Sequence, residues 1–193
     1  MLAELQRVGV KVHCAAGGAV PPRQLVPVFH QWIKDGLVPE HVLIDVADYD
    51  HVPDGPGVML VAHEGNFAMD LGGGRLGLMY YRKQPLAGDL PARLRACAHI
   101  ILAACSRLEQ TPALAGRLRF DAGSLELFAN DRLHAPNAPD TYTAFQPLLD
   151  GFLRSAYGDA ACTTERPPDP RDRFGLRIRG PQVDVAQTIA RLA

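Results

Sequence analysis

The sequence lacks an excess of charge of either sign. Its 193 residues carry 20 Lys and Arg against 21 Asp and Glu, which gives a formal net charge of −1. Proteins that wrap nucleic acid around themselves need a clear basic excess, because each neutralised phosphate takes a Lys or an Arg. We therefore expect no extended nucleic-acid interface, although a local basic patch is compatible with this balance.

Long apolar runs are also lacking. No stretch approaches the roughly 18–20 apolar residues that span a bilayer, and residues 1–7 show no basic segment followed by an apolar one, as a secretory signal would. The four cysteines, Cys14, Cys97, Cys105 and Cys162, form no CxxC pair. Free thiols are typical of a reducing compartment. The sequence thus predicts a cytoplasmic protein without membrane insertion.

Signatures of established enzymes and cofactor sites are missing as well. The run Gly72-Gly73-Gly74 is followed by Arg75 and a strand pattern, whereas a phosphate loop ends in Gly-Lys-Ser/Thr and opens a helix. There is no G-x-S-x-G nucleophile elbow, no dinucleotide fingerprint, no His-Glu-x-x-His and no calcium loop. We therefore predict no cofactor and no metal.

What is present is the composition of an ordinary globular protein. Hydrophobic residues make up 47% of the chain and charged residues 21%, far from the composition of disordered chains. A chain of this length is enough for one sizeable domain. We expect residues 1–193 to form a single α+β domain.

Strands are predicted where apolar and polar residues alternate, or where a short run is wholly apolar. In the first of them Val8, Val10 and Val12 alternate with other residues, which predicts one buried face. The strands are expected at 8–12, 41–46, 58–62, 76–81, 117–120, 125–128, 162–165 and 174–179.

Helices are predicted where apolar residues recur with a period of 3.6. Three longer helices are expected at about 25–36, 90–109 and 140–157, and a short one at about 184–192. Gly36 suits a helix end, and Pro147 is expected to bend its helix. The predicted fold class is α+β, with a mixed or mainly antiparallel sheet.

The two halves of the chain, 8–110 and 117–180, share an order of strand, helix, strand, proline-containing loop and strand. In their helices, 27–33 and 147–153 both read proline, apolar, apolar, polar, any residue, aromatic, aliphatic. Duplication of a ferredoxin-like βαββ unit explains the match, and so does helical amphipathicity alone. Both explanations stay open.

Four segments, 27–33, 43–49, 51–58 and 130–137, resemble those of an uncharacterised family of bacterial hypothetical proteins. The similarity covers most of the chain. Because that family has no assigned activity, the resemblance implies no catalytic residue and no ligand. It implies only one bacterial, cytosolic unit.

The most crowded polar stretch supplies the candidate catalytic residues Asp45, Asp48, His51, His63 and Glu64. Antiparallel pairing of the two strands that carry them is expected to bring them near one another. Carboxylates and imidazoles placed together can hold a divalent metal or act as general acid and base. The alternative is that the aspartates only set turns by bonding their own backbone. Asp45 needs a partner if it is buried, since it interrupts an apolar strand.

Arginines supply the candidate binding residues. Arg117 and Arg119 alternate with apolar residues, as do Arg177 and Arg179, so four guanidinium groups share one sheet surface if their strands are neighbours. Arg132 and Arg173 are expected nearby. Such a patch could take a phosphate, a nucleic-acid backbone or an acidic protein partner. The alternative is a solvated sheet face balanced by Glu126 and Glu165 in cross-strand pairs.

Two functions of different class follow from these patterns. The first is a non-catalytic binding or accessory protein that acts through protein–protein contacts, with a protein partner or as a homo-oligomer such as a homodimer. The second is a metal-assisted or acid–base enzyme that uses the Asp45–Glu64 residues. The missing catalytic motifs and the balanced charge favour the first.

Overall fold

The computed structural model of the chain describes residues 2–53 and 55–192. One continuous sheet of eight strands, in the order β2-β3-β4-β5-β1-β6-β8-β7, runs through it. The strands are β1 (Val8–Cys14), β2 (Leu43–Tyr49), β3 (Gly57–Ala62), β4 (Gly65–Asp70), β5 (Gly77–Arg82), β6 (Phe120–Ala129), β7 (Thr163–Glu165) and β8 (Gly175–Arg179).

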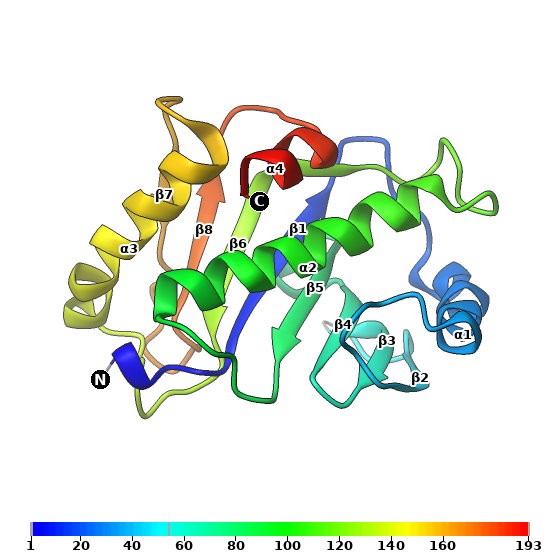
Figure 1. Cartoon of the computed structure of the whole chain (residues 1–193), viewed down its shortest axis with the longest axis horizontal. Helices are drawn as coiled ribbons and strands as arrows, with labels where there is room; N and C mark the ends of the chain where they lie inside the picture. The colour runs from blue at the N-terminus through cyan, green and yellow to red at the C-terminus, as the bar shows by residue number, and fades with distance from the viewer. Residues whose placement is uncertain (1, 54, 193) are drawn as a thin grey trace.

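The helices lie together on one side of the sheet (Figure 1). They are α1 (Val26–Asp35), α2 (Leu90–Gln110), α3 (Pro139–Tyr157) and α4 (Val185–Leu192), with short 3-10 turns η1 (Leu2–Glu4), η2 (Pro22–Leu25) and η3 (Gly72–Gly74). Every strand pairing is antiparallel. The predicted α+β fold class is confirmed.

Three helical crossovers build this layer. Each joins two strands that run in the same direction with others between them: β1 to β2 through α1, β5 to β6 through α2, and β6 to β7 through α3. The crossover from β1 runs toward the β2 edge of the sheet, whereas those from β5 and β6 run toward the β7 edge. β1 is also antiparallel to β5 and β6, so both the strand direction and the direction of the crossover are reversed. If all three crossovers have the same hand, which is right-handed in nearly all proteins, their helices therefore lie on the same side of the sheet. The other side of the sheet receives no α-helix from them.

The core lies between the sheet and the helices. Val10 and Val12 of β1 and Leu60 of β3 point into it and are fully buried. Phe29 and Trp32 of α1 pack edge to face with ring centroids 5.5 Å apart. The apolar face of each element thus meets another apolar face, as two-layer packing requires.

One strand was not predicted. β4 (Gly65–Asp70) reads Asn-Phe-Ala-Met in its middle and lacks a clean apolar–polar alternation. Asn66 is nevertheless buried, because its amide donates to Tyr81 Oη at 2.7 Å. Pairing with β3 and β5 on both sides stabilises this segment as a strand, which local pattern could not show.

The prediction of two short strands between residues 117 and 128 was wrong. β6 is one long strand that begins at Phe120, and the register to β1 shifts between Val12 and Cys14. Residues 121–124, which were expected to separate the two short strands, form a bulge within this strand. A Cβ on Gly123 would meet the carbonyl oxygen of Pro181 at 2.0 Å, so only glycine fits there.

The prediction of one buried face for the first strand was also wrong. On the side away from the helices, Lys11 and His13 are each only 1% exposed. Gly9 lies directly beneath the ring of Phe128, since a Cβ at this glycine would be 2.3 Å from Phe128 Cζ. β1 is thus buried on both faces as the fifth strand in an order of eight.

Both halves of the sheet follow the same path. A central strand leads through a helix to an outer strand, and the chain returns through hairpins to the strand beside it, with a helix after the last one. Pro27 lies in the first turn of α1, whereas Pro147 lies inside α3. Common ancestry of the halves stays a prediction.

In the part of the chain that the structure describes, no helix is both long enough and apolar enough to cross a membrane.

Candidate functional site

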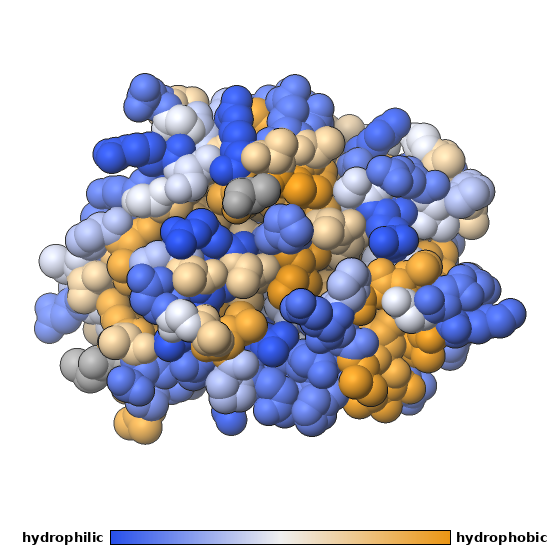
Figure 2. All heavy atoms as spheres, viewed as in Figure 1, coloured by the Kyte–Doolittle hydropathy of each residue, from blue (hydrophilic) through white to orange (hydrophobic). Residues whose placement is uncertain are grey.

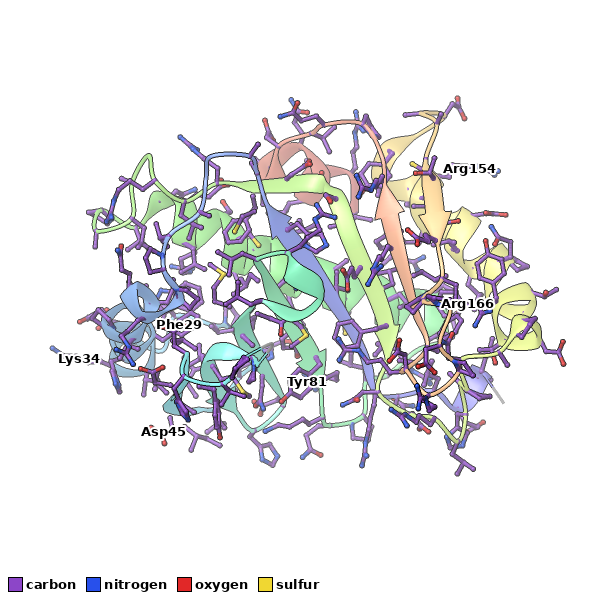
Figure 3. All side chains as sticks on the ribbon, turned by 180° about the vertical axis from the view of Figure 1, so that it is seen from behind. Phe29, Lys34, Asp45, Tyr81, Arg154 and Arg166 are labelled. Carbon is purple, nitrogen blue, oxygen red and sulfur yellow. The ribbon has the colours of Figure 1, made fainter. Side chains whose placement is uncertain are left out.

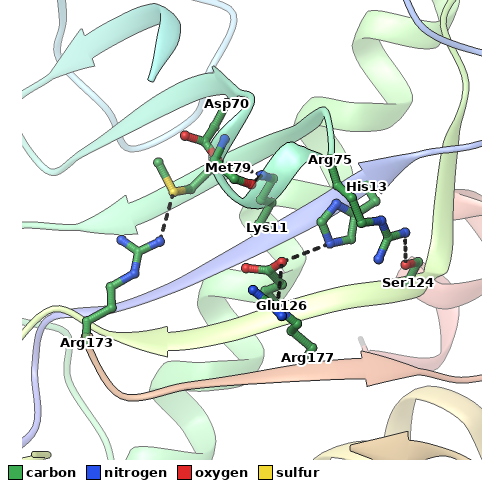
Figure 4. A network of polar contacts seen from close by, with 10 residues as sticks. Lys11, His13, Asp70, Arg75, Met79, Ser124, Glu126, Arg173 and Arg177 are labelled. Carbon is green, nitrogen blue, oxygen red and sulfur yellow. Dashed lines mark hydrogen bonds and ion pairs between the residues drawn. The ribbon is translucent and has the colours of Figure 1, made fainter. Parts of the chain in front are cut away.

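The sheet face opposite the helices carries a network of charged side chains at its centre (Figure 4). Lys11 and His13 come from β1, Asp70 from the end of β4, Glu126 from β6 and Arg177 from β8. Alternate residues of a strand point to opposite faces. The strands that bury valine and leucine beneath the helices therefore place these charges on the other side.

Lys11 and Asp70 form the most buried ion pair of the network. Lys11 Nζ lies 2.6 Å from Asp70 Oδ2, and the two side chains are 1% and 13% exposed. The ammonium also donates to the carbonyl oxygen of Gly72 in η3 at 3.0 Å, and the Gly72 amide donates back to Asp70 at 3.1 Å. A buried ammonium needs such partners because an unpaired charge is costly away from water.

His13, Glu126 and Arg177 form a second group beside this pair. His13 Nε2 lies 3.2 Å from Glu126 Oε1, and Arg177 Nε lies 3.8 Å from the same oxygen. Neither ring nitrogen of His13 makes a well-formed hydrogen bond within the described residues. Burial alone would raise the pKa of Glu126, but neighbouring His13, Lys11 and Arg177 together lower it below its ordinary value.

Arg173 comes from the loop that precedes β8 and lies across the sheet. Its guanidinium carbon is 3.7 Å from the centroid of the Phe128 ring, a cation–π contact. One of its N–H groups points at Met79 Sδ at 3.7 Å, and thioether sulfur is a weak acceptor. Among the described residues, no carboxylate lies within ion-pair distance of Arg173.

A hollow of about 300 Å³ opens beside these residues. η3 borders one side, where Gly73 has a positive φ of 72°, and the loop before β8 borders the other. The charged residues and glycines on its wall are Asp70, Gly72, Gly73, Glu126, Asp172, Arg173, Gly175 and Arg177. The hollow therefore brings two arginines and three carboxylates to one place on the uncovered sheet face.

The four predicted binding arginines do not share one sheet surface. Arg117 and Arg119 precede β6 in a turn. Arg117 donates to Gln24 Oε1 at 3.0 Å, and Arg119 lies 3.9 Å from Glu109 of α2. The predicted strand over 117–120 does not form, so this pair points elsewhere.

Arg177 belongs to the network, as does Arg173, which was expected near it. Arg179 lies on the same face of β8, opposite Ser124 of β6, and is exposed. Arg132 is exposed in the loop after β6. Its predicted place beside the other arginines therefore gains no support from the fold.

The predicted catalytic residues are spread over both ends of the β2–β3 hairpin. Asp45 pairs with Val61 near the end where His63 and Glu64 make the turn into β4. Asp48 and His51 lie at the other end, separated by most of the six residues of β3, each of which advances about 3.4 Å. The described residues include no group of three or more His, Cys, Asp or Glu that could hold a metal.

The aspartates of this hairpin have local partners. Asp45 is exposed, and its carboxylate accepts the amide of Val46 at 2.7 Å. Asp48 accepts the Asp50 amide at 3.0 Å and Arg23 Nε at 3.1 Å. The backbone N–H of Asp50, and then Arg23, lower the pKa of Asp48. These contacts are those of residues that set turns and bulges.

None of the cysteines has the surroundings of a nucleophile. All four thiols are free. Burial raises the pKa of Cys14 and of Cys97 to about 12, and it raises the pKa of Cys105 and Cys162 as well. The reactive species is the thiolate, so these side chains stay protonated and unreactive near neutral pH.

The free edge at β2 is the other unusual surface. Six large apolar side chains are exposed in the described residues: Val42, Ile44, Tyr49, Val52, Leu71 and Leu133. The first four lie on or beside β2. Figure 2 shows apolar residues gathered at the end of the molecule that carries α1 and β2. In the rear view of Figure 3, Asp45 marks this end and Arg154 and Arg166 mark the opposite one.

Sequence reasoning missed Lys11, His13 and Asp70 of the network. They come from two strands, β1 and β4, and no motif links them to Glu126, Arg173 and Arg177. The one available signal was the placement of Lys11 between Val10 and Val12, with His13 directly after Val12. The Gly72–Gly74 run, which does not match the sequence pattern of a phosphate loop, borders the hollow.

In comparisons with protein-family models, curated proteins and solved structures, nothing matches this chain. The resemblance to a family of bacterial hypothetical proteins stays a prediction.

Proposed function

We propose that this chain is a non-catalytic binding or accessory protein of the bacterial cytosol. It acts through protein–protein contacts, and β2 is the strand to which an extended segment of a partner protein adds. The observation that carries the proposal is the concentration of exposed apolar side chains at this sheet edge, where Ile44 is 56% and Val42 is 63% exposed.

An unpaired strand edge offers a row of backbone N–H and C=O groups to another strand. Strand addition uses these groups for affinity and the alternating side chains for specificity. β2 has seven residues and only one neighbouring strand, β3. It is long enough to accept a partner strand, and its apolar side chains would be buried by one.

The charges at this edge indicate the chemistry of the partner. Asp45, Asp48 and Asp50 lie on or directly after β2, and Arg23 is within 4.0 Å of the last two. A partner segment with apolar residues and one or more Lys or Arg would complement them. A second copy of β2 would instead bring further aspartates onto the same ribbon, so we favour a different protein.

The enzyme predicted as the alternative has no such support. It needs Asp45, Asp48, His51, His63 and Glu64 at one site, and these residues lie at both ends of the β2–β3 hairpin. The raised pKa of the cysteine thiols also gives no nucleophile. Binding is therefore the function that the geometry favours.

The test is quantitative affinity capture from the source cells with the immobilised chain and two variants. Ile44→Lys places a charge on the proposed contact. Leu133→Lys is the matched control, because Leu133 is 80% exposed and lies in the loop after β6, away from β2. We expect one stoichiometric partner that binds the wild type and Leu133→Lys and is lost from Ile44→Lys.

Equal capture by both variants would contradict the proposal. So would a purified chain that forms a dimer and is dissociated by Ile44→Lys, because a second copy would then occupy the edge. Circular dichroism of both variants checks that each remains folded. Neither substitution alters a buried side chain, so both are expected to fold.

A further inference from the structure

The hollow on the uncovered sheet face is separate from the β2 edge, and its chemistry points to a ligand of its own. We infer that it binds a small molecule or group that bears an oxyanion, a carboxylate or a phosphate, held by Arg173 and Arg177. This site extends from Asp70 at the end of β4 and from η3 to β8, so β3 lies between its walls and β2.

The first support is the unmet hydrogen-bonding capacity of Arg173. A guanidinium carries five N–H donors in a fixed fork, and Met79 Sδ is the single acceptor that the described residues give it. Its guanidinium carbon lies 3.7 Å from the centroid of the Phe128 ring, a contact that holds the fork against the sheet. A planar oxyanion can accept two parallel N–H groups from such a fork.

Arg177 adds a second cation. Its one ion pair within 4.0 Å among the described residues is with Glu126 at 3.8 Å, too long for a hydrogen bond, and its side chain is 43% exposed. Arg177 also approaches Gly73, where an added Cβ would be 3.6 Å from its terminal nitrogen. Both guanidinium groups line the same hollow, so one bound group can meet donors from both.

The carboxylates on the wall balance these arginines only in part: Glu126 lies 3.8 Å from Arg177, and Glu126 and Asp70 also hold other partners. Asp70 pairs with Lys11 at 2.6 Å and accepts the Gly72 amide. Glu126 lies 3.2 Å from His13. The third, Asp172, is exposed at the rim.

His13 gives an independent sign that the network is incomplete. It is 1% exposed, and neither ring nitrogen makes a well-formed hydrogen bond in the described part of the chain. Buried polar groups are almost always satisfied. Its Nε2 lies 3.2 Å from Glu126 Oε1, and Glu126 lines the hollow.

The size of the hollow fits a small ligand. At about 300 Å³, it lies at the lower end of the range of ligand pockets, about 300–1,000 Å³. A single water accounts for only about 30 Å³ of liquid. The space therefore suits a compact acid or phosphate ester with its anionic group on the two arginines.

The experiment is a two-dimensional ¹H–¹⁵N NMR titration with inorganic phosphate and, separately, with succinate, at constant ionic strength. Gly73 and Gly175 line the hollow, and their amide signals report on it. We expect saturable shifts of these signals in the wild type. Phosphate alone would identify a phosphate ligand, succinate alone a carboxylate, and either result supports the site.

The variants are Arg173→Met and Arg177→Met, with Arg179→Met as the matched control. Arg179 lies on the same strand and the same face but does not line the hollow. Losing one charged fork should weaken binding by about 10- to 100-fold, as expected for hydrogen bonds to a charged group, while Arg179→Met binds like the wild type. The control for folding is the unchanged spectrum of each variant outside the hollow.

No saturable shift with either probe would overturn the inference. Equal binding by Arg173→Met, Arg177→Met and the wild type would overturn it too, since the shifts would then come from nonspecific ion effects. The β2 edge is not touched by these substitutions, so this result is independent of the partner-capture test.

Discussion

The two faces of the sheet are built from the same strands but held in different ways. On the face under the helices, side chains such as Leu60, Phe67 and Leu78 are fully buried among other apolar groups. On the other face, Lys11 and His13 are equally buried but depend on specific partners. Apolar packing tolerates any good fit, whereas buried charges are stable only when paired. The incompletely paired residues of the second face are therefore where we expect ligands.

The largest effect on the free energy of unfolding is expected from breaking the buried ion pair of the uncovered face. Asp70→Ala leaves the Lys11 ammonium, 1% exposed, without its carboxylate. Removing one partner of a buried pair typically costs about 3–5 kcal/mol. Urea unfolding should show a loss of this order in the free energy of unfolding.

The matched control is the double variant Lys11→Met/Asp70→Ala, which removes both charges. It should recover more than half of the loss, because no uncompensated charge remains. A single-variant loss below about 1 kcal/mol, the size expected of an exposed pair, would contradict the account of this face.

The next largest loss of stability is expected at one of two adjacent residues of β3, whose side chains point to opposite faces of the sheet. Leu60 is fully buried on the helix side, and Met59 is half-buried on the other. Leu60→Ala should cost about 2–5 kcal/mol, the range for large-to-small core changes, and Met59→Ala clearly less. Equal losses in thermal or urea unfolding would mean that the uncovered face is packed as tightly as the core.

A pH dependence is expected from Glu126. Its pKa is lowered in the folded chain from the ordinary value of 4.5. The charged carboxylate therefore stabilises the fold at pH values above 4.5. This stabilisation is lost as the pH falls through the lower pKa of the folded chain. Each unit of lowering is worth about 1.4 kcal/mol. Glu126→Gln should therefore show a flatter loss of stability on acidification than the wild type, and identical slopes would contradict the proposed coupling to His13, Lys11 and Arg177.

The smallest effect on the free energy of unfolding is expected from Arg173→Met, measured without any ligand. This change removes a half-buried charge that lacks a carboxylate partner and keeps apolar contact with Phe128. We expect the free energy of unfolding to stay within about 1 kcal/mol of the wild type or to rise, as for unpaired buried charges replaced by apolar groups. A large loss would mean that Arg173 has a structural role.

Much of the fold could be predicted from periodicity. The 3.6 period over residues 90–109 predicted α2 (Leu90–Gln110), and alternation around Leu78 and Tyr80 predicted β5. β4 could not be predicted, because Asn66 and Ala68 are both buried on the uncovered face and the alternation disappears. The turn at Arg117 and Arg119 was missed because its apolar residues, Leu114 and Leu118, are buried without a strand.

Only part of the site could be predicted. Arg177 was recognised by its alternation in β8, and Glu126 as an acidic residue able to pair with it across strands. Arg173 was expected near Arg177, although it lies in the preceding loop and has no periodic signal. The pairing of Lys11 with Asp70 joins residues 59 positions apart. Such contacts depend on the strand order β4-β5-β1-β6-β8, which single-sequence patterns do not contain.

The most direct test of the proposed function is site-specific photo-crosslinking in the source cells. A photoreactive amino acid is placed at Ile44 on β2 or at Leu133, two side chains that are both more than half exposed. We predict that position 44 yields one crosslinked partner of a defined mass and that position 133 yields none. No product from position 44, or the same products from both positions, would contradict the proposal that this edge binds a partner.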